Sequence, residues 1–580
     1  MNFYKKFFYF WVILVTISFT SCKKDSGTLL EVSPVEISIA AAGGNVSFTI
    51  NTEAASWNID NPASDWLTLS KSTGTDQSVT VVATVASKTI SQRVATLTVT
   101  AGDATPVTLT VTQSPSSYLY ALDPDQISLS FDENGGSKTF SVITDAPSWL
   151  LSANVSWIDI SKTSGVAGVT EVTITASKNT DTQTRTARLT LSGPLAPTTD
   201  ISVSQAPQFY PSYNISPIAA DATGMTSTAV QLAAKIKLGW NIGNTMEASG
   251  GETNWGNPLI SKELIQLVKA SGFNAVRIPC AWNQYMDDAA NARISASWLN
   301  RVKEVVQYCA DNGMYVILNI HWDGGWLENN CTVTKQLANN AKQKAFWEQI
   351  ATKLRDFDEH LLFASANEPN VANATEMEVL NSYHQTFINA VRATGGKNTY
   401  RVLVVQGPST DIQKTHDLFT TLPTDPTPNR MMVEVHYYTP WNFCGLTKDE
   451  TWGRMAYYWG NGYHSTTDAT RNSTWGEEAD VDKYMGMMKT QFVDKGIPVV
   501  MGEFSATRRS ALTGNDLALH LASLAYYTKY VTHAAIANGV LPFYWDNGGQ
   551  DNNSSGIFDR KNNVVFDQKI VDALVQGAAK

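Results

Sequence analysis

Eight apolar runs alternate with amphipathic helical patterns between residues 226 and 580, and each run carries polar side chains at or near its end. The runs include "NAVRIP", "MYVILNIHW", "LLFASANEP" and "IPVVMGEFS", and they are separated by patterns such as "WLNRVKEVVQYCADNG". Strands that alternate with helices favour a parallel sheet. Eight such units over about 350 residues predict a (β/α)8 TIM barrel in the segment 226–580.

The polar endings of these runs are expected to meet in space. In a (β/α)8 barrel the carboxyl ends of all strands lie at one face, where active sites are built, while the interior stays apolar. Glu368 follows the fourth run and Glu503 ends the seventh, so two carboxylates should face each other across one cleft. The other endings supply Asn244, Arg277, His321, Asn367, Gln406, His436, Tyr438 and Trp545.

Two carboxylates at one mouth suit glycoside hydrolysis. One carboxylic acid protonates the leaving oxygen, and the second attacks the anomeric carbon or activates water. Arg277 and Tyr438 could hydrogen-bond one carboxylate and keep it ionised, and the more enclosed carboxylate would then hold its proton. We interpret Glu434, on the sixth run, as a satisfied barrel residue rather than a third catalyst.

The motifs "VRIP", "NIHW", "NEP", "HYY", "GEF" and "FYW" recur in an order that resembles glycoside hydrolase family 5. The resemblance implies that Glu368 is the acid/base, Glu503 the nucleophile of a retaining enzyme, and Asn367 the partner of the sugar 2-hydroxyl. It also implies that Trp545 is a platform under the attacked ring. Further substrate contacts are implied for Asn244, Arg277, His321, Trp322, His436 and Tyr438.

A longer match points to a subfamily. "GWNIGNTMEA", "WGNP" and "GFNAVRIPCAW" resemble subfamily 4, which implies an endo-β-1,4-glucanase for cellulose-type, mixed-linkage or xyloglucan chains. Ala364 and Asn370 depart from that pattern, where Glu and Arg are usual. The alternatives are a β-mannanase or another β-glycanase on the same scaffold and, from another class, a non-catalytic glycan-binding surface lipoprotein. The presence of both carboxylates argues against the last.

Residues 36–207 contain an internal repeat. Both copies alternate apolar and polar residues and share a Trp, an Arg-containing run and a closing Gln, with Trp66 and Trp157 expected inside strands. This alternating pattern predicts two tandem Ig-like β-sandwiches of about seven strands each, over 36–115 and 118–207. The copies resemble BACON domains, and both glycan binding and a spacer role remain open for them.

The first 22 residues read as a lipoprotein signal peptide. Lys5 and Lys6 precede an uncharged run at 7–20, and Ser21–Cys22 resembles a bacterial lipobox, with an ordinary secretory signal as the alternative. We therefore expect an exported protein that is lipid-anchored to the cell envelope through Cys22, at the outer membrane or cell surface. Linkers are expected at 23–35 and 208–225.

Charge and cysteine spacing exclude several classes of function. The net charge of −10, from 43 Lys plus Arg and 53 Asp plus Glu, argues against nucleic acid and fits a neutral ligand or none. The partner that the family resemblance implies is a β-glucan polysaccharide. No cofactor is expected, and we expect a monomer. Neither a metal nor a zinc site is expected, because the cysteines beyond Cys22 show no CxxC spacing; they could pair, in an order that the sequence leaves open. These are Cys280, Cys309, Cys331 and Cys444.

Overall fold

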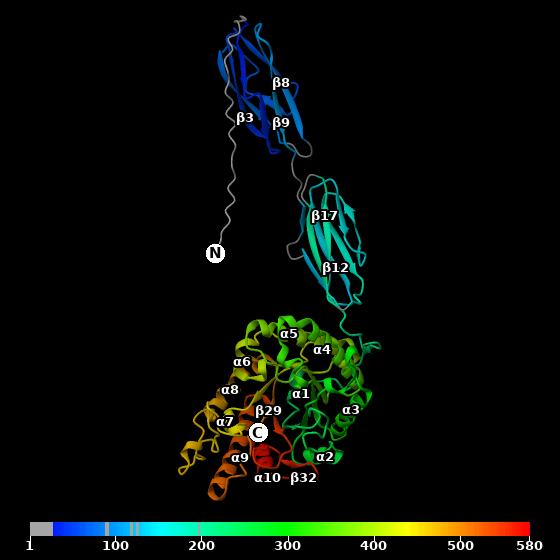
Figure 1. The fold of residues 1–580 in the computed structure, drawn as a ribbon, viewed down its shortest axis with the longest axis vertical. Coiled ribbons are helices and arrows are strands. Elements are labelled where there is room, and N and C mark those ends of the chain that lie inside the picture. Colours follow the sequence, from blue (N-terminus) through cyan, green and yellow to red (C-terminus); the bar gives the residue numbers. More distant parts are fainter. Residues whose placement is uncertain are drawn as a thin grey trace. The chain divides into compact units, whose positions relative to one another are not determined.

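The computed structural model describes residues 27–87, 92–115, 120–122, 127–181, 183–194 and 198–579 (Figure 1). One compact unit reaches Ala206, and the other begins at Pro207 and also takes in residues 181–183. The predicted signal peptide and Cys22 lie outside the described residues, so lipidation stays a prediction. Within the described part of the chain, no helix has the length and hydropathy that a membrane-spanning segment needs.

The first repeat folds as a β-sandwich. Its strands are β1 (Leu30–Ser33), β2 (Glu36–Ile39), β3 (Gly44–Thr52), β4 (Trp57–Asp60), β5 (Leu67–Leu69), β6 (Thr73–Gly74), β7 (Ser78–Val85), β8 (Arg93–Ala101) and β9 (Val107–Gln113). The two sheets have the orders β1-β3-β7-β5 and β2-β9-β8-β4-β6. The sandwich begins at Leu30, inside the expected linker 23–35, because β1 pairs with β3.

The second repeat has the same topology, with sheets β10-β12-β16-β14 and β11-β18-β17-β13-β15. Its strands are β10 (Tyr120–Leu122), β11 (Ser128–Phe131), β12 (Gly136–Thr144), β13 (Trp149–Ala153), β14 (Ile158–Ile160), β15 (Ser164–Gly165), β16 (Gly168–Ala176), β17 (Arg185–Ser192) and β18 (Thr199–Gln205). Each sandwich therefore has more than the seven strands expected, since very short strands such as β6 and β15 add to the sheets.

The residues that define the repeat form a structural cluster in each copy. The Arg93 guanidinium lies 4.2 Å from the ring centre of Trp66 and donates to Gln113 at 2.7 Å. Arg185 repeats these contacts in the second copy, at 4.4 Å from Trp157 and 2.9 Å from Gln205. Trp66 and Trp157 are only partly buried and precede β5 and β14, so the prediction that they lie inside strands is wrong; the buried tryptophans of the two sandwiches are Trp57 and Trp149.

The carboxyl-terminal unit contains the predicted barrel. Eight parallel strands close it in chain order, as the strand pattern predicts. They are β20 (Gly239–Ile242), β21 (Ala275–Ile278), β24 (Tyr315–Asn319), β25 (Leu361–Ala364), β27 (Leu403–Gln406), β28 (Met431–Tyr437), β29 (Val499–Phe504) and β30 (Val540–Asp546). Short ladders outside the barrel are formed by β19 (Ile218–Ala220), β22 (Met286–Asp288), β23 (Arg293–Ile294), β26 (Gly395–Gly396), β31 (Phe558–Asp559) and β32 (Val564–Val565).

Helices surround the barrel and begin where the sequence offers capping side chains. Ser295, for example, caps α3 by accepting the N–H of Trp298, whose ring begins the buried face of that helix. The helices are α1 (Ala229–Ala233), α2 (Lys262–Ala270), α3 (Ala296–Asp311), α4 (Val333–Leu354), α5 (Ala374–Ala393), α6 (Ile412–Leu418), α7 (Trp441–Cys444), α8 (Glu478–Gln491), α9 (Gly514–Ala537) and α10 (Gln568–Ala578).

The inside of the barrel is filled by apolar side chains, as expected for this architecture. Ile317, Leu362 and Phe543 belong to a buried cluster that also includes Leu232 of α1, so this helix packs against the interior of the barrel. The mouth at the carboxyl ends of the strands is therefore left for polar groups. The four cysteines of this unit, Cys280, Cys309, Cys331 and Cys444, are buried free thiols.

The segment 208–225, expected to be a linker, packs on the barrel unit instead. Its strand β19 pairs with β26, and Tyr213 packs against the main hydrophobic core. The buried carboxylate of Glu348, on α4, accepts the backbone N–H groups of Tyr213 at 2.6 Å and Asn214 at 3.1 Å. The prolines that suggested a linker do prevent regular secondary structure over much of this segment. Contacts with α4 and β26 nevertheless hold its backbone in one path.

Candidate active site

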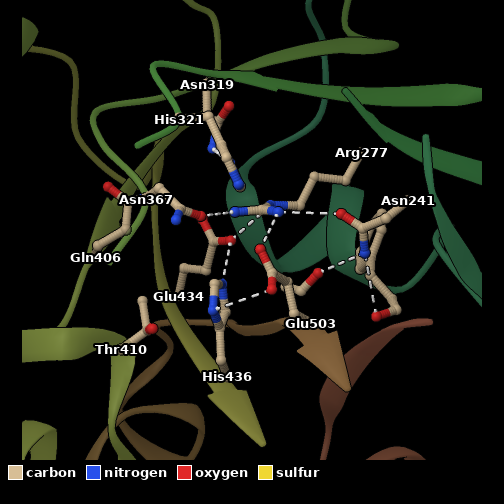
Figure 2. A network of polar contacts seen from close by, with 12 residues as sticks. Asn241, Arg277, Asn319, His321, Asn367, Gln406, Thr410, Glu434, His436 and Glu503 are labelled. Carbon is tan, nitrogen blue, oxygen red and sulfur yellow. Dashed lines mark hydrogen bonds and ion pairs between the residues drawn. The ribbon is translucent and has the colours of Figure 1, made fainter. Parts of the chain in front are cut away.

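A guanidinium lies at the centre of the barrel mouth (Figure 2). Arg277, on β21, is fully buried and donates to Glu503 at 2.8 Å, to the Asn241 side chain at 3.0 Å and to the Asn367 side chain at 2.7 Å. Its Nε atom lies 2.8 Å from a Glu434 carboxylate oxygen. One side chain thus joins residues from five strands of the barrel or the segments that directly follow them.

Glu503 is the more enclosed of the two candidate carboxylates. Its side chain, on β29, is 7% exposed and receives hydrogen bonds from Arg277 at 2.8 Å and from the Tyr438 hydroxyl at 2.9 Å. Arg277 and Tyr438 thus hydrogen-bond the same carboxylate, as the sequence analysis anticipated. Which of the two carboxylates holds a proton stays a prediction.

Glu368 follows β25, and its side chain is 43% exposed. His436 Nδ1 lies 2.7 Å from its carboxylate. Burial would raise the pKa of Glu368, but the hydrogen bond from His436 and the positive charges of His436 and Arg277 hold it below its usual value. Burial would likewise lower the pKa of His436, but Glu503, Glu368 and Glu434 raise it to about 10. His436 is therefore an imidazolium whose Nδ1–H donates to the Glu368 carboxylate.

The two candidate carboxylates lie close together. Oxygen atoms of Glu368 and Glu503 and a ring nitrogen of His436 lie within 4.8 Å of one another. The pairing of β28 with β29 shifts register between Val435 and His436, and this irregularity sets His436 opposite Glu503. Such bulges commonly re-aim side chains beside active sites.

Glu434 is a structural member of the site, as the sequence interpretation held. It is fully buried and lies between Arg277, the Nε2 atom of His436 at 3.3 Å and the Gln406 amide, which donates at 2.6 Å. Burial would raise the pKa of Glu434, but Arg277 and His436 hold it low. Gly502 leaves room for it, since a Cβ atom there would lie 1.9 Å from a Glu434 oxygen.

Two aromatic side chains from the ends of β24 and β30 stack on each other in the site. The rings of His321 and Trp545 stack with centres 5.8 Å apart, and the Asn319 side chain lies 3.2 Å from His321 Nδ1. Burial, together with the charges of Arg277 and His436, holds the pKa of His321 well below its ordinary value, so this ring is neutral. Trp322 follows directly, and its side chain is 46% exposed, which leaves an indole face available for a sugar ring.

Sequence reasoning missed Asn241 and singled out Asn244 in its place. Asn244 lies in the loop after β20 with a φ of 57°, and its backbone N–H bonds the Glu247 carboxylate. Asn241, inside β20, is fully buried, accepts from Arg277 and donates to the Gly502 carbonyl at 2.8 Å. The available signal was an amide in the middle of an otherwise apolar run.

A cavity of about 190 Å³ opens on the Glu368 side of the site. Its lining includes Glu368, Ser409, Thr410, Gln413, Tyr438 and Tyr484. Ser409 and Thr410 have φ values of 54° and 47°. Two consecutive non-glycine residues in the left-handed region are unusual, and such backbone strain is concentrated at functional sites.

Comparison with known proteins identifies the family. The family described as "Cellulase (glycosyl hydrolase family 5)" matches residues 241–551, more than half of the chain. The chain belongs to glycoside hydrolase family 5. This family 5 enzyme is therefore a glycoside hydrolase of the endoglucanase type. The BACON family, described as a putative binding domain, matches residues 55–114 and 148–206, which lie in the two sandwiches.

Relatives of the family 5 enzyme cover both parts of the chain. A xyloglucan-specific endo-β-1,4-glucanase of Bacteroides ovatus is 37% identical over 468 residues, which are 77% of this chain and 89% of that protein. The solved structure of a Bacteroides ovatus family 5 xyloglucanase with a XXXG heptasaccharide has a TM-score of 0.59 at 35% identity, covering 79% of this chain and all of that one. A broad-specificity GH5-4 endoglucanase of Ruminococcus champanellensis with bound cellotriose has a TM-score of 0.51 at 32% identity, covering 60% and 98%.

Proposed function

We propose that the protein is a retaining endo-β-1,4-glucanase, with Glu503 as the nucleophile and Glu368 as the acid/base. The observation that carries this proposal is the pair of carboxylates whose oxygens lie within 4.8 Å, one of them held by Arg277. Retaining enzymes need carboxyl groups about 5 Å apart, whereas inverting enzymes need about 6.5–9.5 Å to seat a water molecule.

The proposal gives each group a task. A Glu503 oxygen attacks the anomeric carbon while Glu368 gives its proton to the departing oxygen, which breaks the glycosidic bond and leaves a glycosyl ester. Glu368 then takes a proton from water, the water oxygen attacks the anomeric carbon, and Glu503 leaves. The half-exposed Glu368 becomes covered when a sugar binds, which favours its protonated form and moves the proton shared with His436 onto the carboxyl.

Early product should keep the β configuration, because two displacements at one carbon restore the original stereochemistry. Proton NMR spectra recorded within the first minutes of hydrolysis should show the β-anomer signal first and the α-anomer signal only as mutarotation proceeds. An initial α-anomer would contradict the double displacement and would require a water molecule between Glu368 and Glu503.

The proposed substrate is xyloglucan, and the proposed subfamily is subfamily 4. The support comes from the relatives: the match to the xyloglucan-specific Bacteroides ovatus enzyme spans 77% of this chain, more than the barrel unit alone, whereas the broad-specificity GH5-4 endoglucanase is less identical and covers 60%. The exposed indoles around the barrel also fit a broad glycan with side branches; they are Trp255, Trp322, Trp441, Trp452 and Trp475.

A panel of polysaccharides tests the substrate assignment. Tamarind xyloglucan, mixed-linkage β-glucan, carboxymethyl cellulose and β-mannan are incubated with the enzyme, and released oligosaccharides are quantified by chromatography. We expect the highest kcat/KM on xyloglucan, with heptasaccharide-sized and larger products and no monosaccharide at early times. Equal activity on unbranched glucans would reduce the assignment to a general endoglucanase, and a preference for mannan would overturn the choice of β-glucan.

A further inference from the structure

A third buried acid touches the segment that carries Glu368. Glu328 lies in the loop after β24, and its side chain is 5% exposed. Its carboxylate accepts the backbone N–H of Glu368 at 2.6 Å, and its carbonyl oxygen accepts the N–H of Asn370 at 2.8 Å. One residue of a neighbouring loop therefore holds the main chain on both sides of Pro369.

The same carboxylate also fixes an amide. The Asn367 side chain hydrogen-bonds Glu328, while the Asn367 oxygen accepts from Arg277 at 2.7 Å. An amide side chain has one acceptor oxygen and one donor nitrogen. With its oxygen on Arg277, Asn367 presents its nitrogen to Glu328, so the two partners together allow only one orientation of the amide.

A carboxylate is a costly choice for this position. Burial raises the pKa of Glu328 to about 7, although the N–H of Glu368 and the Asn367 side chain favour its charged form. A neutral acceptor could satisfy one N–H group at lower desolvation cost. What the carboxylate adds is acceptor capacity for two donors of the same short segment, the Glu368 N–H and the Asn367 side chain.

We propose that Glu328 is a positioning residue for proton transfer: it fixes the backbone from which the Glu368 carboxyl projects and the orientation of the Asn367 amide. This inference rests on the proposed function, in which Glu368 is the proton donor. Glu328 itself does not reach the reacting atoms. A misplacement of about 1 Å can reduce a rate by about 10²-fold. The loss should appear only where the leaving group needs a proton.

The test compares two leaving groups. For each variant we define the ratio of activity on xyloglucan, whose sugar leaving group needs a proton, to the glycosylation rate on a 2,4-dinitrophenyl β-cellobioside, whose leaving group does not. Glu328→Ala should lower this ratio by about 10²-fold. Glu328→Asp, which keeps the charge but shortens the side chain, should lower it in the same direction. Glu328→Gln keeps one acceptor, which can serve the Glu368 N–H, but loses the second acceptor for the Asn367 amide, so its ratio should fall between those of the alanine variant and the native enzyme.

Glu348→Gln is the matched control. Glu348 is also a buried carboxylate that accepts backbone N–H groups, but its partners are in the segment 212–214. This control should lower the thermal midpoint without changing the ratio. If Glu328→Ala does not fold, the Asp and Gln variants decide. An equal loss on both substrates in the Glu328 variants would overturn the positioning role. A Glu368→Ala variant without leaving-group dependence would instead overturn the proposed function.

Discussion

Replacing Glu503 with Gln should abolish hydrolysis of every substrate, whatever the leaving group. The amide is nearly isosteric with the carboxylate but cannot form the glycosyl ester. Neither the polysaccharide nor the activated aryl glycoside can then form the glycosyl-enzyme. Removal of a covalent nucleophile costs on the order of 10⁶-fold in kcat. Initial rates of the variant on xyloglucan and on a dinitrophenyl cellobioside should fall by similar factors relative to the native enzyme. The native enzyme is diluted until its rates lie in the range measured for the variant.

Control measurements separate chemistry from folding in the Glu503 variant. Glu503 neutralises the fully buried Arg277, so its loss should also lower the thermal midpoint. Glu348→Gln gives the effect of losing a buried carboxylate outside the site. Azide added to Glu503→Ala can take the place of the missing side chain and should yield an α-glycosyl azide. A β-glycosyl azide from this variant would assign Glu503 to the other role.

Replacing Glu368 with Ala should give a different kinetic pattern. Hydrolysis of xyloglucan should fall by about 10²–10⁴-fold, the usual contribution of a general acid or base, because the sugar leaving group departs unprotonated. A dinitrophenolate leaves without a proton, so glycosylation should survive. The second step then lacks its base, and the glycosyl-enzyme should accumulate as a burst of dinitrophenolate followed by slow turnover.

Azide provides the decisive check on Glu368. It attacks the anomeric carbon without needing a base, so it should accelerate turnover of the aryl glycoside by Glu368→Ala and release a β-glycosyl azide. Mass spectrometry of the protein before azide addition should show the mass of one bound glycosyl unit. If the variant loses the burst and forms only an α-glycosyl azide, the roles of Glu368 and Glu503 are exchanged.

The barrel and the convergence of its polar endings could be predicted because both follow from pattern and topology. An apolar run that ends in Glu503 is a local signal, and the closure of eight parallel strands brings such endings together without further information. The carboxylate spacing followed from the strands that carry Glu368 and Glu503. These inferences needed no knowledge of individual contacts.

The parts of the site that were missed or misjudged depend on contacts between distant segments. Which carboxylate is enclosed depends on the orientation of the Arg277 and Tyr438 side chains, and the local sequence does not predict either orientation. Glu328 lies in a loop with no periodicity, so its bond to Glu368 could not be anticipated. Asn241 was hidden inside an apolar strand. The segment 208–225 resembles a linker in composition, and only its contacts with α4 and β26 reveal a fixed path.

That fixed path determines how mechanical load would enter the catalytic unit. A pull applied through the amino-terminal sandwiches meets the β19–β26 ladder and the Glu348 bonds to Tyr213 and Asn214 before it meets α1. These contacts clamp the chain to α4 and to the segment after α5, and Leu232 of α1 stays packed in the barrel interior as long as they hold. We therefore expect a pull from the amino-terminal side to load the outer helices first, before it reaches the strands whose opposite ends carry the carboxylates.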